Sequence, residues 1–221
     1  ETENLLKNDI QKSEDGVVGY LETEEALNKN ERIKIDASRI QGSISLKGLK
    51  IDDLIFKNYK ETLNEDSELV TLFRPSSTKG GYFSNFGWIK GSSQENLDLP
   101  NDQTVWRTDS KQITHNNSAI FSWTNNQGIQ FEQEISIDEN YMFTIKQKVI
   151  NNTDNVINLT PVAKISRTDT PETLGFFILH EGPIGVIDDV LEELDYKDLK
   201  KNIGPIEYKS KGGWFGITDK Y

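Results

Sequence analysis

Two histidines are the side chains best suited to moving protons, because imidazole titrates near neutral pH. His115 stands in the turn-like stretch ITHNNS, and His180 ends the apolar run FFILH. A lone histidine at a strand end is usually structural, so we expect neither to be catalytic. The chain has no cysteine, which excludes thiol chemistry, disulfides and cysteine-ligated zinc. Two histidines also argue against a histidine-rich metal site.

Adjacent carboxylates form the second candidate for chemistry: Asp52-Asp53, Asp188-Asp189 and Glu192-Glu193. A glycosidase needs two carboxylates on either side of a sugar at a defined separation, which adjacency in the sequence does not supply. In a chain with 36 acidic residues such pairs are expected on a solvated surface. The sequence therefore predicts no catalytic residue, no cofactor and no metal site.

Tryptophans and a glycine pair offer two further motifs. Trp88, Trp106, Trp123 and Trp214 could stack on a sugar, but packing in the core or on a sheet is the commoner role. The stretch STKGGYF, residues 77–83, lacks the Gly-x4-Gly-Lys-Ser/Thr spacing of a phosphate-binding loop. We therefore interpret its glycines as turn residues.

The charge distribution separates a short segment from the rest of the chain. The net charge is −11, and residues 1–31 alone hold nine acidic and three basic residues. An acidic chain repels phosphate backbones, so we expect no nucleic-acid partner. We expect residues 1–31 to be an acidic flexible linker with a short helical piece near residues 22–27. No run of 18 apolar residues is present in the sequence as given.

Period-two alternation begins at Arg32 and predicts short strands. RIKID and GSISLKG alternate apolar and polar residues, and DDLIF and LVTLF follow them. Residues 119–166 read as four strands, AIFSWT, IQFEQEISI, YMFTIKQKVI and VINLTPVAKIS, joined by Asn-, Asp- and Gly-rich turns. We expect these four strands to form an antiparallel meander with one solvated face, and a break in phase between Phe131 and Ile135.

One helix is predicted over residues 187–201. Ile187, Val190, Leu191 and Leu194 follow helical spacing, with aspartates at the start, lysines at the end and Gly-Pro beyond. The sequence therefore predicts one large antiparallel β-sandwich with a helix near its C-terminus.

Several of these stretches occur together, and in order, in a known family. RIKID, GSISLKG and IDDLIFKNY are followed by LFRPSSTKGGYFSNFGW and finally by SKGGWFGITDKY. This series resembles the periplasmic domain of the YidC membrane-protein insertase family in its α-proteobacterial form. The likeness runs from about residue 31 to residue 221.

The resemblance implies a fold and a division of the chain. The fold would be mainly β, an antiparallel β-supersandwich similar to galactose mutarotase and sugar-binding proteins, with a short C-terminal helix. Residues 1–31 would be a tether that follows a transmembrane helix absent from this sequence, and residues 32–221 would be the folded periplasmic domain. A mutarotase site needs a paired histidine and glutamate, and no motif here supplies that pair.

The resemblance also implies a function, without catalysis or a cofactor. The intact protein would insert and fold proteins of the bacterial inner membrane, with or without the Sec translocon. Its partners would be nascent membrane proteins, the Sec translocon and its accessory subunits. A sugar-binding sandwich and a purely structural spacer remain alternatives.

The terminal motif carries the most specific residue expectations. It consists of Gly212, Gly213, Trp214, Gly216 and Tyr221, which by resemblance lead toward the membrane core. We expect the glycine pair to allow a tight turn or a close backbone approach. We expect Trp214 to be largely buried, so that Trp214→Ala would cost about 3–5 kcal/mol.

Overall fold

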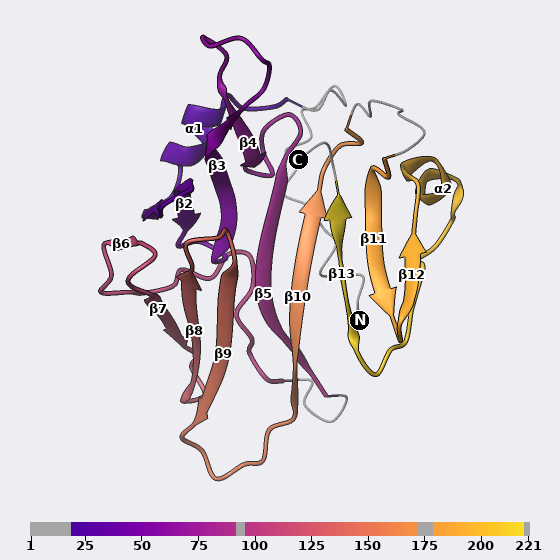
Figure 1. The fold of residues 1–221 in the computed structure, drawn as a ribbon. Helices are drawn as coiled ribbons and strands as arrows, with labels where there is room; N and C mark the ends of the chain where they lie inside the picture. Colours follow the sequence, from indigo (N-terminus) through magenta and orange to yellow (C-terminus); the bar gives the residue numbers. More distant parts are fainter. Residues whose placement is uncertain (1–18, 92–95, 172–178, 219–221) are drawn as a thin grey trace. The chain divides into compact units, whose positions relative to one another are not determined.

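The computed structural model describes residues 19–91, 96–171 and 179–218 (Figure 1). The chain divides into two compact units, Glu1–Thr168 and Asp169–Tyr221, and each is described by itself. Strands dominate both units. Among the described residues, no helix has the length and apolar character needed to cross a membrane.

The first unit opens with a short helix, α1 (Thr23–Asn28), where a helical piece was predicted. Ten strands follow it along the chain: β1 (Arg32–Asp36), β2 (Ile40–Ser45), β3 (Lys50–Lys60), β4 (Leu69–Phe73), β5 (Tyr82–Lys90), β6 (Gln112–Ile113), β7 (Ala119–Thr124), β8 (Ile129–Ile137), β9 (Phe143–Asn151) and β10 (Leu159–Arg167).

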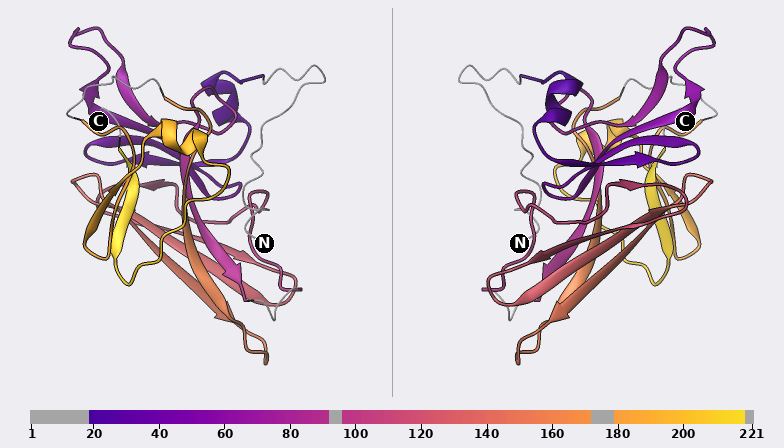
Figure 2. Two further views of the ribbon diagram at one scale, coloured as in Figure 1. Left: turned by 90° about the vertical axis from the view of Figure 1, so that its right-hand side faces the viewer. Right: turned by 90° about the vertical axis from the view of Figure 1, so that its left-hand side faces the viewer.

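These strands form two sheets. The larger sheet has seven strands in the order β10-β5-β3-β2-β1-β6, with β4 paired to β3. Its pairs are antiparallel apart from the short parallel pair of β1 and β6. The smaller sheet is the antiparallel meander β7-β8-β9. The two sheets form separate layers (Figure 2).

One apolar core lies between the two layers. Ile35 and Ile44 of the larger sheet and Phe121 and Phe131 of the smaller sheet all belong to it and are fully buried. The rings of Trp88 on β5 and Phe131 on β8 meet edge to face with centroids 5.1 Å apart. Alternating side chains from two facing sheets are the usual core of a β-sandwich, so the predicted fold class is confirmed.

The predicted four-stranded meander is wrong in its last step. β7, β8 and β9 pair in sequence, but β10 pairs with β5 in the other sheet, from Leu159 opposite Lys90 to Arg167 opposite Tyr82. Residues 152–158 carry the chain between the layers. Alternation predicts that a segment is a strand, but it contains no information about which strand becomes its neighbour.

The predicted break in phase within β8 is also wrong. The strand alternates without interruption, and Gln133 takes the inward position between Phe131 and Ile135 with 1% of its surface exposed. Its Nε2 donates a hydrogen bond of 2.9 Å to the carbonyl oxygen of Phe86 on β5. Opposite it on β9, Gln147 Nε2 donates to the carbonyl oxygen of Gly87 at 2.7 Å. The two amides thus link the layers.

The second unit contains a three-stranded antiparallel sheet in the order β12-β11-β13. Its elements are β11 (Gly182–Ile187), β12 (Val190–Glu193), α2 (Tyr196–Lys201) and β13 (Gly213–Thr218).

The helix predicted over residues 187–201 is therefore wrong in its first half. Ile187 and Val190 pair across a two-residue hairpin turn, in which Asp188 and Asp189 have φ of 47° and 68°. Aspartate tolerates this left-handed conformation, and two such residues match the turn that joins twisted strands. The apolar spacing fitted a helix and a hairpin equally well, and only the short C-terminal helix α2 remains.

Candidate functional site

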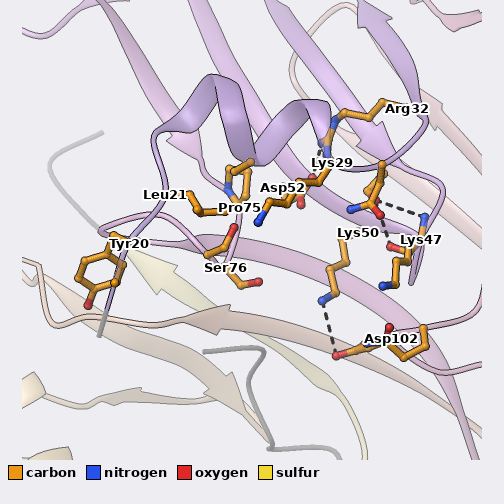
Figure 3. A pocket seen from close by; sticks show the side chains of 16 residues that line it. Tyr20, Leu21, Lys29, Arg32, Lys47, Lys50, Asp52, Pro75, Ser76 and Asp102 are labelled. Atoms are coloured by element: carbon orange, nitrogen blue, oxygen red, sulfur yellow. Dashed lines mark hydrogen bonds and ion pairs between the residues drawn. The ribbon is translucent and has the colours of Figure 1, made fainter. Parts of the chain in front are cut away.

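A cleft of about 490 Å³ opens on the first unit (Figure 3). Its walls come from residues 19–21, the end of α1, the loop after β2, the start of β3 and the segments 75–77 and 102–103. The cleft thus gathers segments far apart in the sequence.

The N-terminal wall is folded against the rest of the unit. Leu21 forms a parallel bridge with Thr78, and its backbone N–H donates to the Ser77 carbonyl oxygen at 2.9 Å. Ala26 of α1 is 5% exposed. Residues 19–30, part of the segment expected to be a linker, therefore help to shape the cleft.

A buried ion pair forms one side of the cleft. The Arg32 guanidinium on β1 meets the Asp52 carboxylate on β3, and the two side chains are 11% and 8% exposed. Arg32 Nε also donates to Ser43 Oγ at 2.7 Å. Burial raises the pKa of Asp52, while the positive charges of Arg32 and Lys50 oppose that rise. Each of the two side chains therefore supplies the counter-charge that the other needs in its buried position.

Lys50 is the second buried charge. Its side chain is 9% exposed, and Nζ lies 3.6 Å from Asp102 Oδ2 and 5.3 Å from the ring centre of Phe83. The carboxylate and the ring face are both favourable neighbours for a positive charge. Lys50 is therefore held in place at the cleft by an ion pair and an aromatic contact.

Lys29 and Lys47 differ from these paired residues. In residues 19–91, 96–171 and 179–218, no carboxylate lies within ion-pairing distance of either ammonium group. Figure 3 shows Lys29, Lys47 and Lys50 reaching into the cleft from different walls. The lining has four basic and two acidic side chains, so it is cationic in a chain of net charge −11.

Sequence reasoning missed this cluster. Its basic residues have no regular spacing, although residues 29–50 hold six basic and only two acidic residues. An excess of lysine next to short strands was the available signal, but its convergence depends on the pairing of the strands.

Of the residues considered for chemistry, Asp52 lines the cleft as the partner of Arg32, whereas the two histidines lie elsewhere. His115 Nδ1 is 3.2 Å from Ser38 Oγ, and His180 Nε2 is 3.0 Å from the Pro183 carbonyl oxygen. Neither lines the cleft, and each contacts local polar groups as a structural histidine would. Across the described ranges, no group of three or more His, Asp or Glu side chains is placed to hold a metal ion.

The tryptophans do not form a sugar-stacking site at the cleft. Trp88 and Trp106 are 7% and 2% exposed and belong to the core, and Trp123 packs against it. The packing role is therefore confirmed for these three.

The terminal motif lies in the second unit. Gly213 has φ of 139°, and a Cβ there would stand 1.9 Å from the Val186 carbonyl oxygen, which confirms the expected close backbone approach. A Cβ on Gly212 or Gly216 would meet nothing within 4 Å. Tyr221 lies outside the described residues.

The expected burial of Trp214 is wrong. Its side chain is 55% exposed, and the neighbouring Phe215 is 66% exposed. Among the described residues, β13 is an edge strand of a three-stranded sheet, and Trp214 shares a face with Val186 and the exposed Leu191. Pairing with β11 along Gly213–Thr218 positions this strand.

The first unit thus defines a class: an antiparallel β-sandwich with a cationic cleft. Residues 32–221 match the family model described as YidC periplasmic domain. The chain belongs to this family, and its place is the periplasm.

Relatives named "Membrane protein insertase YidC" agree with this assignment. The protein from Rickettsia bellii is 44% identical over 86% of this chain, and that from Rickettsia rickettsii (strain Iowa) is 39% identical over 99%. The protein from Bradyrhizobium diazoefficiens is 41% identical over 89% of the chain. The matches cover 34%, 38% and 32% of the three relatives, so this chain spans about a third of their length.

Proposed function

We propose that this chain is the periplasmic domain of a membrane-protein insertase of the bacterial inner membrane. The supporting observation is the family match over residues 32–221, together with relatives that carry the name of the insertase. In this proposal the domain acts by protein–protein contact and catalyses no reaction. Its substrates are nascent membrane proteins.

The finer proposal concerns partners and organisation. The Sec translocon and its accessory subunits are the proposed partners, and nucleic acid is not one, since the chain carries a net charge of −11. The segment 1–31 connects the domain to the membrane part, with residues 19–30 packed on the domain, and the motif Gly212, Gly213, Trp214, Gly216 and Tyr221 leads from the domain toward the membrane part.

A depletion strain tests this proposal. The full-length protein is expressed while the native copy is depleted, and insertion of one Sec-dependent and one Sec-independent client is followed by protease protection. We expect both insertions to fail on depletion and to recover with the full-length protein. Unchanged insertion of both clients after depletion would contradict an insertase function.

Two deletions in the full-length protein then separate the parts of the domain. One removes residues 32–201 and the other removes residues 206–221. If only the second deletion stops growth, the sandwich is accessory and the terminal segment is the required connection to the membrane part. If only the first stops growth, the sandwich carries an essential contact.

A sugar-binding sandwich is the rival function. Titration calorimetry with a panel of hexoses distinguishes the two, and we expect no saturable heat. A saturable signal that disappears on substitution of an exposed aromatic residue would favour the rival.

A further inference from the structure

We propose that the cleft of the first unit binds a ligand through a phosphate group. The inference does not depend on the proposed insertase function, because it rests only on the charges and donors that line the cleft. The cleft volume of about 490 Å³ lies within the range of roughly 300–1,000 Å³ that is typical of small-molecule sites.

The first step concerns the positive charge that remains in the cleft after its ion pairs are counted. Arg32 is paired with Asp52, and Lys50 with Asp102. Lys29 and Lys47 then contribute two ammonium groups without a carboxylate partner among the described residues. Two like charges that line one cleft repel each other, and an anion bound in the cleft offsets that repulsion.

The second step is the supply of neutral hydrogen-bond donors. Ser76 and Ser77 on one wall bring hydroxyl groups to the same cleft, and Asn30 and Gln103 bring amides. Ser45 also lines it, but its hydroxyl donates to the Lys47 carbonyl oxygen at 3.1 Å. Donors around ammonium groups suit a ligand that offers several acceptor oxygens.

The third step is the choice of anion. A phosphate monoester carries about −1.5 to −2 charges at neutral pH and three acceptor oxygens, which matches two ammonium groups and several donors. A single carboxylate carries one charge and leaves the second ammonium group uncompensated. Lysine is a common point-charge partner of phosphate. The carboxylates of Asp52 and Asp102 repel such a ligand weakly, because each already has a basic partner.

The phosphate monoester could belong to a soluble molecule or to the headgroup of a lipid that ends in a phosphate monoester, such as phosphatidic acid. The chemistry of recognition is the same for both sources. The net charge of −11 opposes the approach of a whole anionic bilayer, whereas a single phosphate group meets the local positive charge of the cleft.

Titration calorimetry with glycerol phosphate tests the site on the 221-residue chain at low ionic strength. The test variant is Lys29→Gln combined with Lys47→Gln, and the matched control is Lys111→Gln, an exposed lysine outside the cleft lining. We expect saturable one-to-one binding that the control keeps and that the double variant weakens by at least about tenfold, since charge-assisted hydrogen bonds are removed. Thermal unfolding of each variant checks that the fold is kept.

Three outcomes overturn the proposal. The first is the absence of saturable binding by the unmodified chain, and the second is an equal loss in Lys111→Gln and in the double variant. The third is binding of an acidic peptide at the cleft when glycerol phosphate does not bind.

Vesicles identify the source of the phosphate. The site would be assigned to a lipid headgroup if the protein cosediments with vesicles that contain phosphatidic acid, does not cosediment with pure phosphatidylcholine vesicles, and is displaced from the former by glycerol phosphate. Binding of glycerol phosphate without cosedimentation would assign it to a soluble phosphate ester.

Discussion

The two units of this chain have similar strands but very different interiors. The buried apolar residues of the described chain, from Ala26 to Ile137, all lie in the first unit. In the second unit, Val190, Leu191, Trp214 and Phe215 are all more than half exposed. The first unit therefore gains most of its stability from a packed core, whereas the second gains it from backbone pairing and turns.

This contrast shows that β-strands can be specified in two ways. In the first unit, side chains from two sheets fill a shared interior, so side-chain volume is decisive. In the second unit, left-handed aspartates at a turn and a glycine in close backbone contact set the arrangement. Substitutions that remove side-chain volume should thus destabilise mainly the first unit. Substitutions that add a Cβ at such a glycine should destabilise mainly the second unit.

The largest effect is expected for Phe131→Ala. Phe131 is fully buried, and its ring centre lies 5.1 Å from that of Trp88 and 5.8 Å from that of Trp123. Truncation should lower the free energy of unfolding by about 3–5 kcal/mol. Urea denaturation measures this loss. Ile120→Ala, on the exposed face of β7, is the control and should cost under about 0.5 kcal/mol. Equal losses of unfolding free energy in Phe131→Ala and Ile120→Ala would mean that core packing does not dominate the stability of the first unit.

Arg32→Met should have the next largest effect, because it leaves the buried Asp52 carboxylate without its partner. Loss of one member of such a pair should cost about 3 kcal/mol at neutral pH. Burial already raises the pKa of Asp52, and removal of Arg32 raises it further. The cost is therefore greatest above that raised pKa and shrinks as the pH falls through it, since the neutral acid needs no counter-charge.

Urea denaturation of the Arg32→Met variant between neutral and acidic pH checks both the size and the sign. Lys34→Met is the matched control, since the Lys34 side chain is 63% exposed and pairs with the exposed Asp36. It should change stability only slightly. A cost for Arg32→Met that grows on acidification would contradict the assigned role of Asp52.

Gly213→Ala should have a smaller effect, confined to the second unit. The residue has φ of 139°, and the new Cβ would clash with the Val186 carbonyl oxygen. Such strain costs on the order of 1–3 kcal/mol. Hydrogen exchange of the β11 amides should accelerate, while the core amides of the first unit should keep their protection. Gly212→Ala has no neighbour within 4 Å and is the control. If both variants accelerate hydrogen exchange of the β11 amides equally, the close backbone approach at Gly213 is not what stabilises this sheet.

The strands of the first unit could be predicted because their alternation is local. β8 coincides with its expected segment and β9 (Phe143–Asn151) overlaps residues 141–150, where a strand was expected, and their inward positions follow the period of two. The partner of β10 could not be predicted, because a seven-residue connection allows the strand to join either sheet. Gln133 was misjudged for a related reason: a polar residue faces inward when a backbone carbonyl in the other layer accepts its hydrogen bond.

The candidate site was less predictable than the fold. Lys29, Lys47 and Lys50 converge only after α1, β2 and β3 have come together, so no spacing in the sequence marks them. In the second unit, the Asp-Asp pair was interpreted as a helix start because aspartate favours both helix N-termini and left-handed turns. The close approach at Gly213 was predictable, because glycine is required where backbone atoms meet.

The smallest effect is expected for Trp214→Ala, which tests the comparison between the units most directly. Trp214 is 55% exposed and Trp88 is 7% exposed, so the same truncation should cost under about 0.5 kcal/mol at Trp214 and about 3–5 kcal/mol at Trp88. Urea denaturation of both variants measures the difference. Iodide quenching that is reduced in Trp214→Ala would show independently that this indole is in contact with solvent. A loss at Trp214 as large as that at Trp88 would mean that the second unit also depends on a buried aromatic side chain, and the distinction between core packing and backbone pairing would no longer hold.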